Sequence, residues 1–239
     1  MQTAVLLKYG QKEHLQEILN GNLYLKCIQF FKENGKDSIG RLDKNENLTD
    51  VWRYPQFNGK LLLNGMEIGT FRNMNIYIPE HDKDFFTHIS SFCLILIDSN
   101  NVGINKLICK KMKKFGEHVL FIHNVPKFQE IIKQACEIHP EITKMKMDKI
   151  EYISKTKYHG SINIFNKFDD LTWQQEYRIA VQNIDRCKED HFFLKIEDIS
   201  NIATVIKADD LGWEYYISNN PDINVYFGTK NIKDDVLLQ

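Results

Sequence analysis

The segment Trp173-Gln174-Gln175-Glu176-Tyr177-Arg178-Ile179-Ala180-Val181 predicts a β-strand with two different faces. Because side chains alternate along a strand, the odd-numbered residues would form a mainly apolar face that can pack. The other face would present an amide, a carboxylate and a guanidinium, from Gln174, Glu176 and Arg178. A carboxylate held beside an amide can orient a ribose and stabilise positive charge on its anomeric carbon. Alternatively, Glu176 and Arg178 pair on a solvated strand edge, a contact worth about 0–1 kcal/mol.

Length and composition indicate a folded protein. With 239 residues, of which 43% are hydrophobic, the chain can bury a substantial core. Its 31 basic and 32 acidic residues nearly cancel, so the net charge does not indicate a nucleic acid or an anionic membrane as partner. No repeat or low-complexity linker divides the sequence. We therefore expect a single α+β domain over residues 1–239, with a polar, loop-rich insertion around 31–58.

Cysteine use and the lack of long apolar runs favour a cytoplasmic location. The five cysteines are odd in number and widely spaced, which is typical of reduced thiols packed in a core. The first eight residues lack the basic and apolar regions of a signal peptide. No later apolar run in the sequence approaches the roughly 18 residues of a membrane span. We expect a cytoplasmic protein without a membrane segment.

Hydrophobic periodicity predicts a mixed α+β fold, with mainly antiparallel sheets and a few flanking helices. The chain would open with a strand at 4–9, a helix at 11–20 that Gly21 ends, and a strand at 23–28. Later strands are expected at 90–97, 118–123, 151–154, 176–182, 192–196, 202–206 and 224–227. Another helix would follow Pro126, with an apolar stripe that includes Phe128 and Ile132, and a short one would span 208–213.

Two further regions have distinctive composition. The polar stretch from 31 to 58 predicts an extended surface loop, followed by strands at 60–63 and 66–71. These strands are joined by Asn64-Gly65, the dipeptide that best tolerates positive φ in a type I′ turn. A helix at 104–115 would carry a basic face, which can be a solvated surface or a phosphate-binding one. Its lysines are Lys106, Lys110, Lys111, Lys113 and Lys114.

The sequence contains no common motif for a metal, a phosphate loop or a serine nucleophile. Its eight histidines form no His-Glu-x-x-His pair, and no two cysteines have two-residue spacing. The twelve glycines are scattered, and no Gly-x-Ser-x-Gly turn occurs. We therefore predict no metal site.

Several short segments resemble a large group of uncharacterised bacterial and phage proteins. The resemblance begins with Leu6-Leu7-Lys8-Tyr9-Gly10, continues with a helix that ends in Leu19-Asn20-Gly21, and includes the strand that follows. It returns at 90–93, 115–122 and 173–179, so it spans most of the chain. The opening is also similar to the first strand and helix of ADP-ribosyltransferases, including those that modify nucleic acid.

In that superfamily three stations line an NAD cleft: a His or Arg on the first strand, a Tyr or Ser on a middle strand, and a late Glu, often within Gln-x-Glu. The matching positions are Lys8 with Tyr9, Ser90 with Ser91, and Gln174 with Glu176. The resemblance implies NAD as substrate, with Glu176 on the nicotinamide ribose and Gln174 orienting a protein or nucleic-acid acceptor. It places Lys8, Tyr9, Ser90, Ser91 and Arg178 in cofactor binding. Lys8 departs from the family pattern, because an ammonium lacks the planar fork of an arginine.

Three functions stay open. The first is an NAD-dependent ADP-ribosyltransferase or NAD-cleaving protein that acts as a toxin or in conflict between bacteria and phage. The second is a non-catalytic binding module on the same scaffold, which would hold a partner or small ligand through residues 34–58 or the lysine-rich helix. The third is a nuclease or nucleic-acid-binding protein, which would use the same lysines but lacks a carboxylate cluster with metal-binding spacing.

Overall fold

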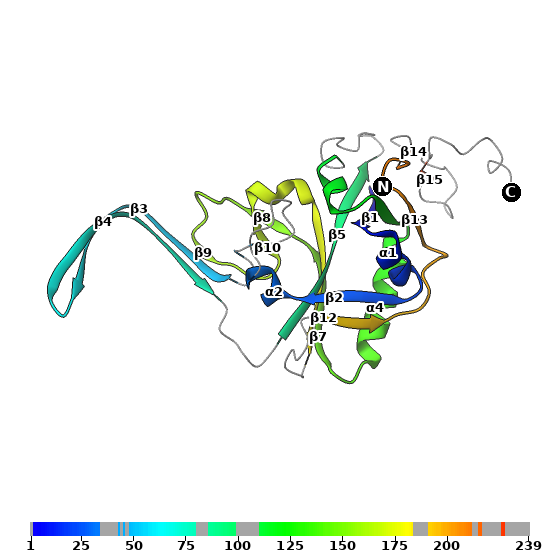
Figure 1. Ribbon diagram of the computed structural model, residues 1–239, viewed down its shortest axis with the longest axis horizontal. Helices are drawn as coiled ribbons and strands as arrows, with labels where there is room; N and C mark the ends of the chain where they lie inside the picture. Colours follow the sequence, from blue (N-terminus) through cyan, green and yellow to red (C-terminus); the bar gives the residue numbers. More distant parts are fainter. Residues whose placement is uncertain are drawn as a thin grey trace.

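Antiparallel strands dominate the fold, as a computed structural model of the chain shows (Figure 1). It describes residues 2–33, 43, 45, 48–79, 86–98, 110–183, 191–211, 215–216 and 226–227. The largest sheet has eight strands, in which β12-β2-β5-β1-β6-β13 form one path and β11 joins β5 to β7. Its strands are β1 (Gln2–Gly10), β2 (Asn22–Cys27), β5 (Phe86–Asp98), β6 (His118–Ile122), β7 (Ile142–Lys149), β11 (Glu176–Asn183), β12 (His191–Lys195) and β13 (Ala203–Lys207).

Helices cover this sheet. The main ones are α1 (Lys12–Leu19), α2 (Ile28–Glu33) and α4 (Val125–Ile138), with short 3-10 helices η1 (Lys113–Phe115) and η2 (Asp169–Gln174). The amide oxygen of Asn124 caps α4 by accepting from the Lys127 N–H, and a proline follows at the start of the helix. The apolar stripe of α4 packs into the largest core cluster, where Phe128 and Ile132 are fully buried. The sheet and α4 therefore share one core.

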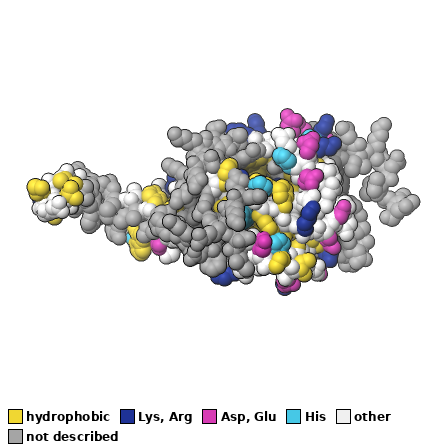
Figure 2. Space-filling view, turned by 60° about the horizontal axis from the view of Figure 1, so that its bottom comes forward, with side chains coloured by type: hydrophobic (Ala, Val, Ile, Leu, Met, Phe, Trp, Pro, Cys, Tyr) yellow, Lys and Arg dark blue, Asp and Glu magenta, His cyan; other side chains and the backbone are white. Residues whose placement is uncertain are grey.

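A long hairpin projects from the body of the molecule. Strands β3 (Leu48–Leu63) and β4 (Met66–Pro79) form this arm, and β9 (Gly160–Ser161) pairs only with its base (Figure 1). The turn at its tip has positive φ at Asn64 and Gly65, 51° and 79°, as the dipeptide predicts. Apolar side chains are exposed near the tip, which is visible at the end of the arm in Figure 2.

Two smaller strand pairs complete the described structure. The strands β8 (Glu151–Ile153) and β10 (Asn166–Phe168) pair in parallel next to the arm's base. A separate pair consists of β14 (Tyr215–Tyr216) and β15 (Tyr226–Phe227). No helix in the described part of the chain is both long and apolar enough to cross a membrane.

The predicted mixed α+β fold with mainly antiparallel sheets is confirmed. The strand-helix-strand opening is correct, and Gly21 ends α1 with φ of +93°. A Cβ at Gly21 would lie 2.4 Å from the Ile196 carbonyl oxygen, so both conformation and close approach require glycine. The predicted strands at 90–97, 118–123, 151–154, 176–182, 192–196 and 202–206 correspond to β5, β6, β8, β11, β12 and β13.

Several predictions need correction. Residues 48–58 belong to β3 and are not a loop, while 34–42, 44 and 46–47 lie outside the described residues. Residues 208–210 form a turn in place of the predicted helix. The sequence analysis missed β7, although Met145 and Met147 alternate with Lys144, Lys146 and Asp148 and pack against the main core. Residues 110–112 are helical and lead into η1, whereas 104–109 are outside the described part.

The segment that begins at Trp173 is a strand only from Glu176 onwards. Residues 169–174 form η2, and Gln175 adopts a left-handed conformation with φ of 44°. From Glu176 on, the predicted alternation holds, since Tyr177, Ile179 and Val181 enter the main core. The alternative of a solvated edge pair is wrong, because β11 lies between β5 and β7 and both faces are buried.

Candidate functional site

The large sheet divides at the middle of β5, and this division positions the candidate site. One edge of β5 pairs continuously with β11, from Phe86 to Cys93. On the opposite edge, β2 pairs with His88 and Ile89, whereas β1 pairs with residues 93–98. Neither of these two ladders includes Ser90, Ser91 or Phe92. The part of β5 predicted to bind a cofactor therefore lies where β1 and β2 separate.

A cavity of about 690 Å³ lies at this separation. All seven predicted site residues line it, although they come from three separate segments of the chain. These residues are Lys8, Tyr9, Ser90, Ser91, Gln174, Glu176 and Arg178. Small-molecule sites typically have volumes of about 300–1,000 Å³ with a few polar groups in an apolar lining. The cavity thus has the size and position of a ligand site.

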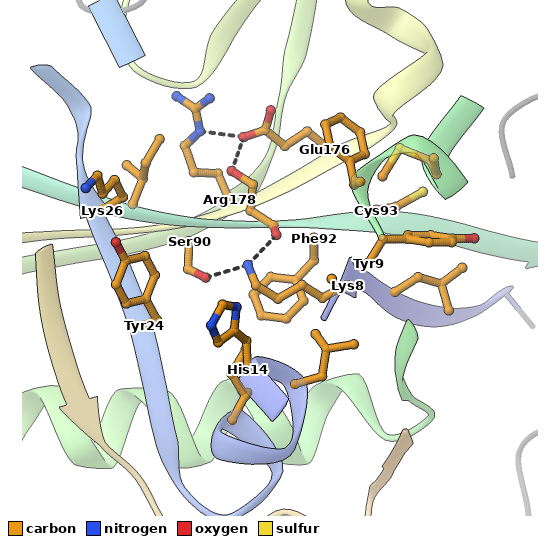
Figure 3. A pocket seen from close by; sticks show the side chains of 18 of the residues that line it. Lys8, Tyr9, His14, Tyr24, Lys26, Ser90, Phe92, Cys93, Glu176 and Arg178 are labelled. Atoms are coloured by element: carbon orange, nitrogen blue, oxygen red, sulfur yellow. Dashed lines mark hydrogen bonds and ion pairs between the residues drawn. The ribbon is translucent and has the colours of Figure 1, made fainter. Parts of the chain in front are cut away.

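Lys8 spans the gap between β1 and β5. Its ammonium donates to the Ser90 hydroxyl at 3.0 Å and to the Ser91 carbonyl at 2.9 Å, and it lies 4.7 Å from the centre of the Phe92 ring (Figure 3). Burial lowers the pKa of Lys8 to about 8, although the negative charge of Glu176 opposes this effect. At neutral pH Lys8 is therefore mainly charged, but it loses its proton far more readily than an exposed lysine.

The Glu176 carboxylate is the centre of a buried polar network. Its Oε1 accepts from the Ser91 hydroxyl at 2.6 Å and from Arg178 Nε at 2.7 Å (Figure 3). Its Oε2 lies 2.7 Å from the Lys167 ammonium. The side chains of Glu176 and Arg178 are only 4% and 0% exposed. Burial favours the neutral acid, but Arg178 and Lys167 outweigh burial and hold the pKa of Glu176 well below its ordinary value, so Glu176 stays ionised.

Gln174 reaches the same network from η2. Its side-chain oxygen accepts from the Lys167 ammonium at 3.1 Å, and the residue is buried. The prediction that Gln174 would share a strand face with Glu176 is wrong, because the strand begins after it. Both residues nevertheless line one cavity, since Lys167 on β10 connects the two side chains.

The sequence analysis missed several residues of this site. Lys167 was the most informative omission, because a lysine flanked by Ile164, Phe165 and Phe168 is a sign of a buried, paired cation. The Tyr152 hydroxyl accepts a hydrogen bond from the Glu176 backbone N–H at 2.9 Å, but the sequence around Tyr152 does not indicate this contact. Further lining side chains come from α1, β2 and β12: His14, Tyr24, Lys26 and Phe193.

Two lysines of the lysine-rich segment make contacts within the molecule. Lys113 forms an ion pair with Asp209, and the Lys111 ammonium lies 5.5 Å from the centre of the Trp173 ring. Among the described residues, no group of three or more His, Cys, Asp or Glu side chains could hold a metal ion. The thiols of Cys27, Cys93 and Cys136 are buried, whereas Cys109 and Cys187 lie outside the described part.

Comparisons with known proteins give no family for the chain: no family model, no curated protein and no solved structure matches it. The functional argument therefore depends on the site itself.

Proposed function

We propose that the protein cleaves NAD at the nicotinamide ribose, as an ADP-ribosyltransferase or an NAD-hydrolysing relative. One observation carries the proposal: the three stations, which are distant in the sequence, converge on one cavity from the neighbouring strands β1, β5 and β11. The lining carries four cations, Lys8, Lys26, Lys167 and Arg178, against the two carboxylates of Glu17 and Glu176. This excess of positive charge suits a ligand that carries a diphosphate.

Glu176 has the capacity for one more hydrogen bond. A carboxylate can accept about four hydrogen bonds. Within the described part of the chain, three donors reach Glu176: the Ser91 hydroxyl, Arg178 and Lys167. A hydroxyl of the nicotinamide ribose would fill the remaining place and bring the carboxylate beside the anomeric carbon.

The chemistry requires no additional redox partner. The bond between C1′ and the nicotinamide nitrogen breaks, and its electron pair leaves with neutral nicotinamide. The positive charge that develops on C1′ is stabilised by the ionised Glu176, whose depressed pKa keeps it negative throughout the neutral range. An acceptor hydroxyl, amine or water then bonds to C1′ and releases a proton to solvent. Gln174 would orient this acceptor.

A specific observation favours a second candidate, a non-catalytic binding module on the same scaffold. Glu176 is already paired with two cations, so it can serve to hold β11 and β10 together. In that case the cavity binds a small ligand through Lys8 and the serines, without turnover.

Nicotinamide release distinguishes the two candidates. Purified protein is incubated with NAD, with and without cell extract, and Glu176→Asp is compared with wild type. Aspartate keeps the charge that Arg178 and Lys167 require, but it withdraws the carboxylate by one methylene, and a displacement of about 1 Å can reduce a rate about 100-fold. The exposed Glu130→Asp on α4 is the matched control and should release nicotinamide at the wild-type rate. If wild type releases none in the presence of extract, or Glu176→Asp is fully active, the proposal fails.

A further inference from the structure

An aromatic strip lies at one side of the cavity, on the outer face of β2 and β12. The register of these strands places Phe193 opposite Tyr24 and His191 opposite Lys26. Directly paired residues of two strands project from the same face of a sheet, and so do residues two apart along a strand. The four side chains therefore share one face, while the opposite face carries buried leucines such as Leu23 and Leu194.

The rings of this strip form a partial stack. Tyr24 and His191 lie 5.6 Å apart between ring centres, with planes inclined by only 21°. Phe193 contacts Tyr24 edge-on, at 5.4 Å and 68°. Tyr24 is 37% exposed and Phe193 is 49% exposed, so the stack does not end in the protein core. Exposed aromatic faces of this kind bind planar rings, because every base has a π-face that can stack.

The strip is continuous with the candidate site. Tyr24, Lys26 and Phe193 line the same cavity as Lys8 and Glu176. Figure 3 shows Tyr24 and Lys26 on the same strand at one side of the cavity, with His14 from α1 near Tyr24 and Ser90. Lys26 and Lys195 place positive charge along the strip. The exposed apolar side chains at the tip of the arm differ, since Leu62, Leu63 and Met66 offer no ring.

We infer that Tyr24, with His191 behind it and Phe193 at its edge, binds a nucleobase whose attached phosphate lies toward Lys26. A base placed against Tyr24 from the cavity would extend the stack that His191 begins. The inference rests on the proposed function in one respect, because the same cavity would hold the dinucleotide. The base can belong to the adenosine part of a dinucleotide or to a single-stranded nucleic acid that serves as acceptor.

Binding measurements without turnover test this inference and separate the two sources. The full chain is titrated with ADP-ribose and, separately, with a ten-residue oligothymidylate at fixed salt. Tyr24→Leu should lower the affinity for at least one of these ligands about 10-fold, because stacking of a base on an aromatic side chain contributes about that much to binding. Tyr24→Phe keeps the ring and should bind as wild type. Tyr77→Leu, which removes a similarly exposed ring from the arm, should also leave binding unchanged.

Each outcome decides between sources or rejects the inference. Ring-dependent binding of ADP-ribose alone assigns the strip to the dinucleotide, and ring-dependent binding of the oligonucleotide alone assigns it to an acceptor. Ring-dependent binding of both supports the inference for both sources. Equal affinity of wild type and a folded Tyr24→Leu for both ligands, or no binding of either, overturns it. These titrations measure binding and not nicotinamide release. Their result can therefore be interpreted even if the proposed cleavage activity is absent.

Discussion

Replacing Glu176 with glutamine should destabilise the whole protein as well as alter the site. Glutamine keeps the shape of the side chain, but it leaves the Arg178 and Lys167 cations, 0% and 7% exposed, without their anion. Removing one partner of a buried ion pair typically costs about 3–5 kcal/mol, because the remaining charge stays desolvated. In a chain of this size about 1 kcal/mol shifts the Tm by roughly 2–4 °C. We therefore expect the Tm of Glu176→Gln to fall by about 6–20 °C.

The same substitution on the surface provides the control. Glu130 on α4 lies 3.1 Å from the Lys127 ammonium, and both side chains are well exposed, 53% and 40%. Exposed pairs contribute about 0–1 kcal/mol, so the Tm of Glu130→Gln should fall by no more than about 4 °C. The two variants differ chiefly in the burial of the pair that is broken.

The pH dependence of the difference follows from the depressed pKa of Glu176. In the unfolded chain this carboxyl has its ordinary pKa of 4.5, and in the folded protein the pKa is lower. The ion pairs therefore stabilise the fold fully above pH 4.5, and this stabilisation is lost as the pH falls below that value. The gap in unfolding free energy between wild type and Glu176→Gln should be constant near pH 7 and should narrow below pH 4.5.

Circular dichroism measures both effects: thermal unfolding at pH 7 gives the Tm, and urea unfolding at pH 7 and at several values below 4.5 gives the gap in unfolding free energy. A Glu176→Gln protein as stable as Glu130→Gln at pH 7 would show that Arg178 and Lys167 do not depend on this carboxylate. A gap that stays constant down to pH 3 would refute the assigned direction of the pKa shift.

Two further predictions concern β1 and its end. Burial lowers the pKa of Lys8 to about 8, so the affinity for ADP-ribose should fall as the pH rises through 8. Calorimetric titration at pH 7 and 9.5 measures this fall in affinity. The fall should be smaller in Lys8→Arg, because the charge of arginine persists at both pH values. Gly116→Ala should lower the unfolding free energy by at least about 1–3 kcal/mol in urea, because a Cβ there would lie 2.3 Å from the Gly10 carbonyl oxygen. Gly69→Ala, where a Cβ meets nothing within 4 Å, should show no comparable loss.

The sequence predicted those elements whose local pattern agrees with their final environment. The stripe of α4 is apolar at helical spacing and is buried as that spacing requires. The Asn64-Gly65 turn needs positive φ and has it. In contrast, β7 carries mostly charged residues, with only Met145 and Met147 between them, and its position beside β11 depends on a pairing that is distant in the sequence. Residues 48–58 likewise extend because β4 is opposite them, which their own composition does not reveal.

The sequence analysis named seven residues that line the cavity, but it missed others and could not give their geometry. Residues from β1, β5 and β11 were identified separately, and the sequence could not show that β1 and β2 separate along one edge of β5. That separation creates the cavity. The alternative prediction, that Glu176 and Arg178 pair on a solvent-exposed strand edge, failed for the same reason. The exposure of these side chains depends on which strands flank β11. Lys167 joins the network from β10, nine residues before Glu176 in the chain and on a different sheet.

Stability alone does not account for this concentration of charge. Buried ion pairs are often no more stabilising than apolar residues of the same volume, which can be better by about 1–4 kcal/mol. The folded-state pKa of Lys8, about 8, lies below its ordinary 10.5, so burial disfavours the protonated lysine relative to the neutral one at neutral pH, and this penalty is relieved only as the pH rises above 8. Lys8, Lys167, Glu176 and Arg178 all line the 690 Å³ cavity, and ionisable groups gathered in a cavity with shifted pKa values are typical of functional sites. Binding of an anionic ligand would stabilise the charged form of Lys8 and offset the cost, which is why we place the function in this cavity and not on the lysine-rich surface.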